Sequence, residues 1–117
     1  MIEYSDFEKV EIRVGTVIEA KFNDKSNKPS IILIIDFGEV IGHKKTSAQL
    51  TKHYIPEDLI GKQVAAVTNF PPKQIGKMIS EVLILGFPDD ENMDKTMAAI
   101  GNSFEGINRI KSFIKIS

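Results

Sequence analysis

The chain has 117 residues, of which 42% are hydrophobic and 26% charged, and its formal net charge is −1. These values are typical of one soluble globular domain. The absence of cysteine excludes disulfides, a thiolate nucleophile and a cysteine-based zinc site. The longest apolar run, residues 31–35, is far shorter than the roughly 20 residues of a membrane helix, so no membrane insertion is expected. The acidic N-terminus does not resemble a signal peptide, which predicts a cytoplasmic location.

The beginning of the chain predicts a short helix and then a long strand. Ser5 and Glu8 have the spacing of a capping box, so a helix is expected to begin at Ser5. Residues 12–22 alternate with a period of two, as in a half-buried strand, and Gly15 indicates a bend or bulge within it. The even-numbered side chains are expected to face the core: Ile12, Val14, Thr16, Ile18, Ala20 and Phe22.

Four further strands are expected, over residues 31–37, 40–48, 62–69 and 78–85. Pro56 and Gly61 are placed to begin and close one helical turn between the third and fourth of the five strands. This layout predicts an all-β fold, a five-stranded OB barrel over about residues 11–86, in a single domain of residues 1–117. The expected core includes Phe22, Leu33, Ile35, Val64, Ala66, Leu83 and Leu85.

The C-terminal part predicts additional elements outside the barrel. Asp90 can cap a helix over residues 91–100. Residues 110–116 alternate like a last strand, although their isoleucines also fit a helix. Since the barrel is already complete at residue 85, we expect this tail and the N-terminal helix to lie at a dimer interface.

Nothing in the sequence indicates catalysis. His43 and His53 are ten residues apart, without the spacing of a zinc-binding HExxH helix. There is no phosphate-binding glycine loop and no nucleophile motif. We therefore expect no enzymatic activity, no catalytic residues, no metal site and no cofactor.

Polar and basic residues gather on the third strand and around the loop between the fourth and fifth strands, which is a ligand-contacting loop in OB barrels. Lysines would neutralise phosphates, while Ser, Asn and Gln could bond bases or peptide amides. Asn69 and Ser80 could equally cap backbone groups, and Phe70 and Tyr54 could stack on a ligand or pack internally. The candidate residues for binding peptide or tRNA are Lys44, Lys45, Ser47, Gln49, Asn69, Phe70, Lys73, Lys77, Ser80 and Glu81.

The charge is unevenly distributed along the chain. Residues 40–80 contain six basic and two acidic residues, whereas the rest of the chain is net acidic. A basic segment on an acidic protein indicates either an anionic partner or simply a solvated lysine-bearing face.

Several of these residues form motifs of a known family. The pattern of Phe7, residues 12–15 and residues 35–38 resembles the opening of the tRNA-binding domain family. One branch, the CsaA proteins described as export-related chaperones, is more similar still. Its resemblance rests on two motifs: Ser47-Ala48-Gln49-Leu50-Thr51-Lys52-x-Tyr54 and Asn69-Phe70-Pro71-Pro72-Lys73-x-Ile75.

This resemblance implies an OB fold, a homodimer and a chaperone that holds unfolded or exported polypeptides. Val82 and Leu83 stand where RNA-binding members of the family carry Gly-Met, which favours polypeptide as the partner. Two alternatives remain open: a tRNA-binding protein that uses the basic segment 44–77, and a non-catalytic docking subunit.

Overall fold

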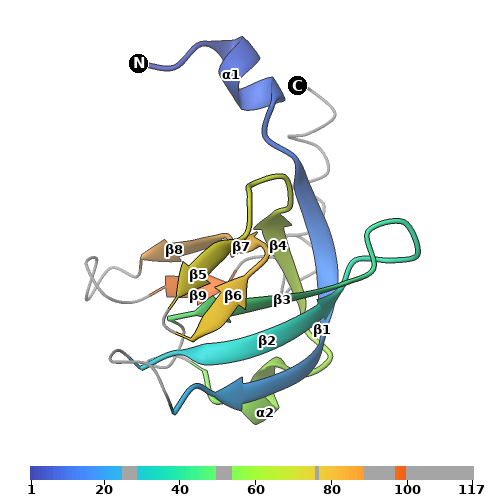
Figure 1. The fold of residues 1–117 in the computed structure, drawn as a ribbon, viewed down its shortest axis with the longest axis vertical. Coiled ribbons are helices and arrows are strands. Elements are labelled where there is room, and N and C mark those ends of the chain that lie inside the picture. The colour runs from blue at the N-terminus through green and yellow to red at the C-terminus, as the bar shows by residue number, and fades with distance from the viewer. Residues whose placement is uncertain (25–28, 50–53, 76, 89–96, 100–117) are drawn as a thin grey trace.

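The computed structural model describes residues 1–24, 29–49, 54–75, 77–88 and 97–99. Its main element is one antiparallel sheet in the order β3-β2-β1-β4-β7 (Figure 1). Its strands are β1 (Ile12–Phe22), β2 (Ile31–Asp36), β3 (His43–Ala48), β4 (Gln63–Val67) and β7 (Leu83–Ile84).

Two hairpins and two short helices complete the described part of the chain. The hairpins pair β5 (Lys73–Ile75) with β6 (Met78–Ser80), and β8 (Gly86–Pro88) with β9 (Met97–Ala99). The helices are α1 (Tyr4–Glu8), which stands off from one end of the barrel, and α2 (Pro56–Leu59), near the opposite end (Figure 1). No helix in the described ranges is long and apolar enough to cross a bilayer.

The sheet curls into a nearly closed barrel, because the chain after β6 returns to the edge strand β3. The Glu81 N–H donates to the Lys45 carbonyl oxygen at 2.8 Å. The predicted all-β, five-stranded OB-type barrel is therefore confirmed.

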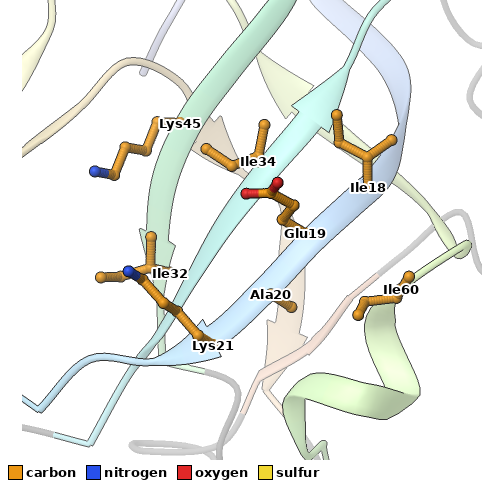
Figure 2. Close-up of a pocket in the computed structure, with 8 residues that line it drawn as sticks. All are labelled: Ile18, Glu19, Ala20, Lys21, Ile32, Ile34, Lys45 and Ile60. Atoms are coloured by element: carbon orange, nitrogen blue, oxygen red, sulfur yellow. The ribbon is translucent and has the colours of Figure 1, made fainter.

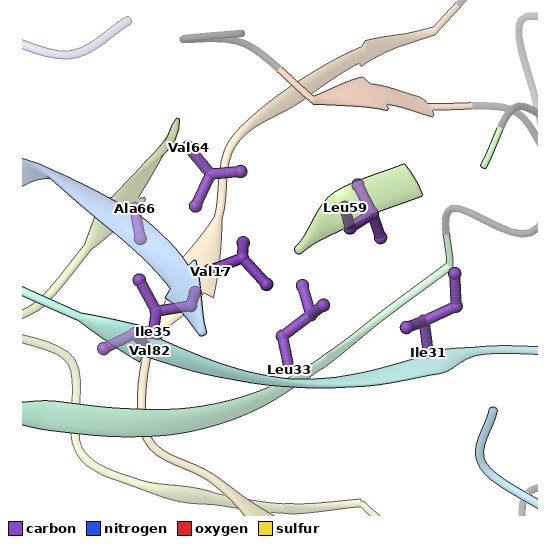
Figure 3. Close-up of a cluster of buried hydrophobic side chains, with 8 residues drawn as sticks. All are labelled: Val17, Ile31, Leu33, Ile35, Leu59, Val64, Ala66 and Val82. Atoms are coloured by element: carbon purple, nitrogen blue, oxygen red, sulfur yellow. The ribbon is translucent and has the colours of Figure 1, made fainter. Parts of the chain in front are cut away.

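A cluster of branched side chains fills the barrel (Figure 3). Leu33, Ile35, Val64 and Ala66 are fully buried, as predicted, and Leu59 of α2 closes the cluster from the end. α2 itself was predicted correctly: Pro56 occupies its first turn, and Gly61 follows at φ 87°, a conformation that glycine adopts without strain.

The predicted inward face of β1 is wrong for the part of the strand before residue 19. Gly15 and Val17 are buried, whereas Ile18 is exposed and Phe22 is 51% exposed. The reason is a register shift between Val17 and Glu19 in the pairing with β2, which exchanges the two faces within the strand. After this bulge Ala20 packs against the core, but Phe22, at the end of the strand, is half exposed.

Gly15 was predicted to mark a bend or bulge in β1. The bulge begins two residues later, at Val17, and Gly15 is required for a different reason. A Cβ built on Gly15 would lie 2.5 Å from Ile35 Cγ2 and 2.8 Å from Phe37 Cδ1. β2 and the residue after it therefore pack directly on the bare backbone of β1. Only glycine leaves room for this contact.

The predicted fifth strand, residues 78–85, is divided into β6 and β7. Its inward side chains include Met78, Ser80 and Val82, so the prediction chose the wrong face. Leu83 is 52% exposed and Leu85 is only half-buried, and neither belongs to the core cluster.

Other predicted elements change as well. The capping box of α1 joins Glu3 and Asp6, with Glu3 N–H donating to Asp6 Oδ2 at 2.8 Å, rather than Ser5 and Glu8. The third strand begins at His43 because residues 38–42 form a tight turn, in which Gly42 N–H donates to the Gly38 carbonyl. The helix predicted over residues 91–100 is wrong at residues 97–99, which form β9; its other residues and the strand predicted over 110–116 lie outside the described residues.

Candidate binding groove

A surface groove opens where three segments of the chain meet. It combines the outer side of β3, the turn after β4 and the chain from the end of β6 into β7, and it encloses about 390 Å³. We call it the Phe70 groove. Its lining residues are Ser47, Phe70, Pro71, Lys73, Ser80, Glu81, Val82 and Leu83.

Half of the predicted binding residues line this groove: Ser47, Phe70, Lys73, Ser80 and Glu81. The other five do not. Lys45 lines a second hollow on the neighbouring strands, Lys44 is half-buried, and Gln49, Asn69 and Lys77 are exposed at other positions.

The walls of the groove carry apolar surface that the barrel does not use. Phe70 is 51% exposed and Leu83 52% exposed, and Pro71 beside Phe70 is exposed as well. Pro71 and Pro72 fix two backbone φ angles, so the turn that presents Phe70 is stiff. Phe70 is thus an accessible aromatic surface, whereas Tyr54 packs against the core, with Lys62 Nζ 5.5 Å from the centre of its ring.

Asn69 fixes the start of this turn by bonding backbone groups far away in the sequence. Its Oδ1 accepts a hydrogen bond from Glu11 N–H at 2.9 Å, and its Nδ2 donates to the Lys9 carbonyl at 2.7 Å. The adjacent Thr68 N–H donates to the Glu11 carbonyl at 2.9 Å. Of the two interpretations that the sequence left open for Asn69, backbone capping is the one these contacts show.

Glu11 joins the same cluster through its side chain. Arg13 Nε donates to Glu11 Oε1 at 2.7 Å, and Thr68 Oγ1 donates to the same oxygen at 2.7 Å. These hydrogen bonds, first from Arg13 and then from Thr68, lower the pKa of the Glu11 carboxyl below its ordinary value of 4.5. The carboxylate form is therefore part of the anchor that holds Phe70 in place.

A buried hydroxyl pair joins β3 to the groove wall at Ser80 and Val82. Thr46 Oγ1 donates to the Val82 carbonyl at 2.7 Å and lies 2.7 Å from Ser80 Oγ. Both hydroxyl groups are buried, so Ser80 holds the groove wall rather than presenting a free hydroxyl to a ligand. Glu81 also binds β3, since its Oε1 accepts from Lys45 N–H at 3.0 Å.

Thr46, Val82 and the apolar wall at Leu83 are not among the binding residues predicted from the sequence. For Thr46 a signal existed: residues 43–48 alternate, and if Ser47 faces outward, Thr46 must face inward. A hydroxyl at an inward position of a small barrel needs a buried partner. The partner itself, Ser80, is 34 residues away and could not be read from spacing.

The described residues offer little to a metal ion or to acid–base chemistry. No three His, Asp or Glu side chains in these ranges come close enough together to hold an ion. His43 is exposed at the start of β3, with Nε2 3.9 Å from Asp36 Oδ1. The groove itself carries one lysine, Lys73, and one carboxylate, Glu81.

Residues 12–106 match the sequence family of the tRNA binding domain. The chain belongs to the tRNA-binding domain family. This match covers more than half of the chain, including the whole barrel. It confirms the family resemblance inferred from the sequence motifs.

Solved structures place this tRNA-binding domain beside CsaA proteins. The CsaA chaperone protein of Picrophilus torridus is 43% identical, with a TM-score of 0.77, over 86% of this chain and 89% of that one. The chaperone CsaA of Bacillus anthracis str. Ames is 45% identical, with a TM-score of 0.73, over 85% and 88%. A MetRS related protein of Pyrococcus horikoshii, 24% identical with a TM-score of 0.74, shares the fold.

Longer proteins contain a similar domain. The methionine–tRNA ligase of Flavobacterium psychrophilum is 36% identical over 112 residues, 92% of this chain and 16% of the ligase. That of Porphyromonas gingivalis strain ATCC 33277 is 38% identical over 88 residues, 75% of this chain and 12% of the ligase. The tRNA-binding domain described here thus spans only a small part of the ligases it matches.

Proposed function

We propose that this tRNA-binding domain is a chaperone of the CsaA kind, which holds an extended, unfolded polypeptide in the Phe70 groove. The observation that carries the proposal is the pair of half-exposed apolar side chains, Phe70 and Leu83, in one groove. The sequence identity of this chain to two CsaA chaperones, over most of each chain, supports the same proposal.

The groove suits an unfolded chain because burial of apolar surface drives such binding. Covering the exposed half of Phe70 removes roughly 100 Å² from water, which is worth about 2.5 kcal/mol. Lys73 and Glu81 place one positive and one negative charge in the groove, an arrangement that fits polypeptides of mixed charge better than a polyanion.

We further expect a cytoplasmic homodimer. α1 has no buried residue, and its Tyr4 and the preceding Ile2 are exposed. A two-fold interface containing α1 and residues 110–116 should bury more than about 1,000 Å². A clean monomer in sedimentation at micromolar concentration would contradict this.

tRNA is the second candidate partner, favoured by the family match and by the exposed lysines Lys45, Lys73 and Lys77. In that case binding would come from phosphate neutralisation. Affinity would then fall with salt at a log–log slope of about −0.7 to −0.9 per contact.

The two candidates are separated by measuring the affinity for a fluorescein-labelled, reduced and carboxymethylated protein and for bulk tRNA, each at low and at ~150 mM salt. We expect Phe70→Ala to weaken binding of the unfolded protein by roughly 10- to 100-fold at both salt concentrations. The combined change Lys73→Glu, Lys77→Glu should leave that binding nearly intact.

Phe22→Ala is the matched control, since Phe22 is also 51% exposed but lines neither hollow. It should bind like the wild type. Tight tRNA binding at ~150 mM salt that disappears in the lysine variant, with no binding of the unfolded protein, would replace the chaperone proposal with tRNA binding.

A further inference from the structure

A second hollow lies on the outer face of the strands β1, β2 and β3 (Figure 2). It encloses about 380 Å³, and Ile32 and Ile34 of β2 contribute to its lining, with Ile18 of β1 and Ile60 after α2. Ile32 and Ile34 alternate along β2 with the fully buried residues of the core, so they face away from the barrel interior. We call this surface the isoleucine hollow.

The isoleucine hollow adjoins the Phe70 groove across one strand. Ser47, which lines the groove, is the direct cross-strand partner of Ile32, and Lys45, which lines the hollow, is the partner of Ile34. Adjacent strands are about 4.8 Å apart, and residues 45 and 47 on one face of β3 are about 7 Å apart. A ligand that fills the groove therefore reaches the hollow within a few residues.

The charges at the hollow distinguish between ligand classes. Cross-strand pairing places Glu19 beside Ile34, and Lys21 beside Ile32. Figure 2 shows the Glu19 carboxylate beside Ile34 in the middle of the hollow, with Lys21 and Lys45 toward its edge. The Glu19 carboxylate in the middle of the surface repels a phosphate backbone. A polypeptide fits better, because an acidic side chain can pair with Lys21 or Lys45 while an aliphatic side chain beside it packs on the isoleucines.

We propose that the isoleucine hollow is a second subsite for the same extended polypeptide. It takes branched aliphatic side chains of the ligand, while the Phe70 groove takes an aromatic one. This inference rests on the proposed function. Crossing from β3 to β1 spans two strand spacings, roughly 10 Å, which about three extended residues bridge. The preferred ligand thus has an aromatic residue separated by about three residues from aliphatic ones.

The test uses two labelled twelve-residue peptides and fluorescence anisotropy. One carries a phenylalanine, three serines and then two isoleucines separated by one serine, in an otherwise Gly/Ser sequence; the other has serine in place of both isoleucines. The wild type should bind the isoleucine peptide about tenfold more tightly, since partial burial of one branched side chain gives that factor.

Ile34→Thr removes the apolar end of the side chain but keeps a β-branched residue that suits a strand. It should weaken binding of the isoleucine peptide about tenfold and leave the serine peptide unchanged, so that the two peptides now bind equally. Val40→Thr is the control, because Val40 is exposed in the turn after β2 and lines neither hollow. Should Ile34→Thr fail to fold by circular dichroism, Ile32→Thr repeats the test.

The possible failures are distinguishable. Equal binding of both peptides by the wild type, with Phe70→Ala abolishing both, would overturn the second subsite and keep the proposed function. No binding of either peptide would overturn the proposed function. Conversion of a dimer into a monomer by Ile34→Thr in sedimentation would assign the isoleucine hollow to a second copy of the chain, and the inference would be wrong.

Discussion

Gly15→Ala should destabilise the barrel although it adds a single methyl group. The new Cβ would lie 2.5 Å from Ile35 Cγ2 and 2.8 Å from the Phe37 ring, well inside contact distance, so β1 and β2 must separate or Ile35 must leave its rotamer. Overpacking of this kind costs about 1–3 kcal/mol, and loss of the glycine's unfolded-state entropy returns about 0.5–1 kcal/mol. The expected net loss is about 1–2 kcal/mol, or roughly 4–8 °C in Tm at this chain length.

Urea denaturation of the wild type, Gly15→Ala and a double variant tests this reasoning. Ile35→Leu removes the clashing Cγ2 at nearly constant volume, so in its background the Gly15→Ala cost should shrink measurably. Gly38→Ala is the contrasting control: nothing lies within 4 Å of its Cβ position, but its φ is +94°. Because asparagine tolerates a positive φ, Gly38→Asn should be more stable than Gly38→Ala. Gly15→Asn should be no more stable than Gly15→Ala, because the obstacle there is steric. A Gly15→Ala protein as stable as the wild type would refute the close-packing argument.

Three further predictions concern hydrogen bonds. The pKa of the Glu11 carboxyl is lowered in the folded state, so its contribution to stability is present above pH 4.5 and is lost as pH falls through the lowered value. Urea denaturation from pH 7 to 3 should therefore show the wild type losing its stability advantage over Glu11→Gln as the pH falls. Among the described residues, Thr46→Val leaves the Val82 carbonyl with only the 3.2 Å bond from Ser80; the change should cost about 1–3 kcal/mol, and Thr46→Ser should cost less. Ser30 Oγ is buried and has no hydrogen-bond partner among the described residues, so Ser30→Ala should leave Tm unchanged or raise it; a drop of several degrees would show an unrecognised partner.

The sequence was sufficient for the strands β1 to β4 but not for the two hairpins, nor for the inward faces of β1 and of the strand predicted over residues 78–85. The run around Leu33 and Ile35 and the signals at Pro56 and Gly61 depend on local chemistry, and the structure confirms them. The bulge after Val17 is a property of the pairing between two strands, so alternation within β1 alone put Gly15 and Val17 on the wrong side.

The candidate site divides in the same way. Phe70 lies in a turn that Pro71 and Pro72 predict, Lys73 begins β5 directly after it, and both side chains line the groove. Asn69 and Ser80 were equally visible, but the direction of their side chains is set by partners at Glu11 and Thr46. Contacts over such separations carry no signal in the spacing of a single sequence.

Those long separations also bear on the order in which the protein folds. Pairing of β1 with β2 and of β2 with β3 joins neighbouring segments, whereas the bonds of Asn69 to Glu11 and Lys9 close loops of 58 and 60 residues. Closing a loop of this length lowers the entropy of the chain before any contact is formed, so these hydrogen bonds are expected to form late in folding. The Phe70 groove is then absent from a partly folded chain. A nascent copy of this protein then has no completed groove, so its folding would be separated in time from the polypeptide binding proposed for that groove.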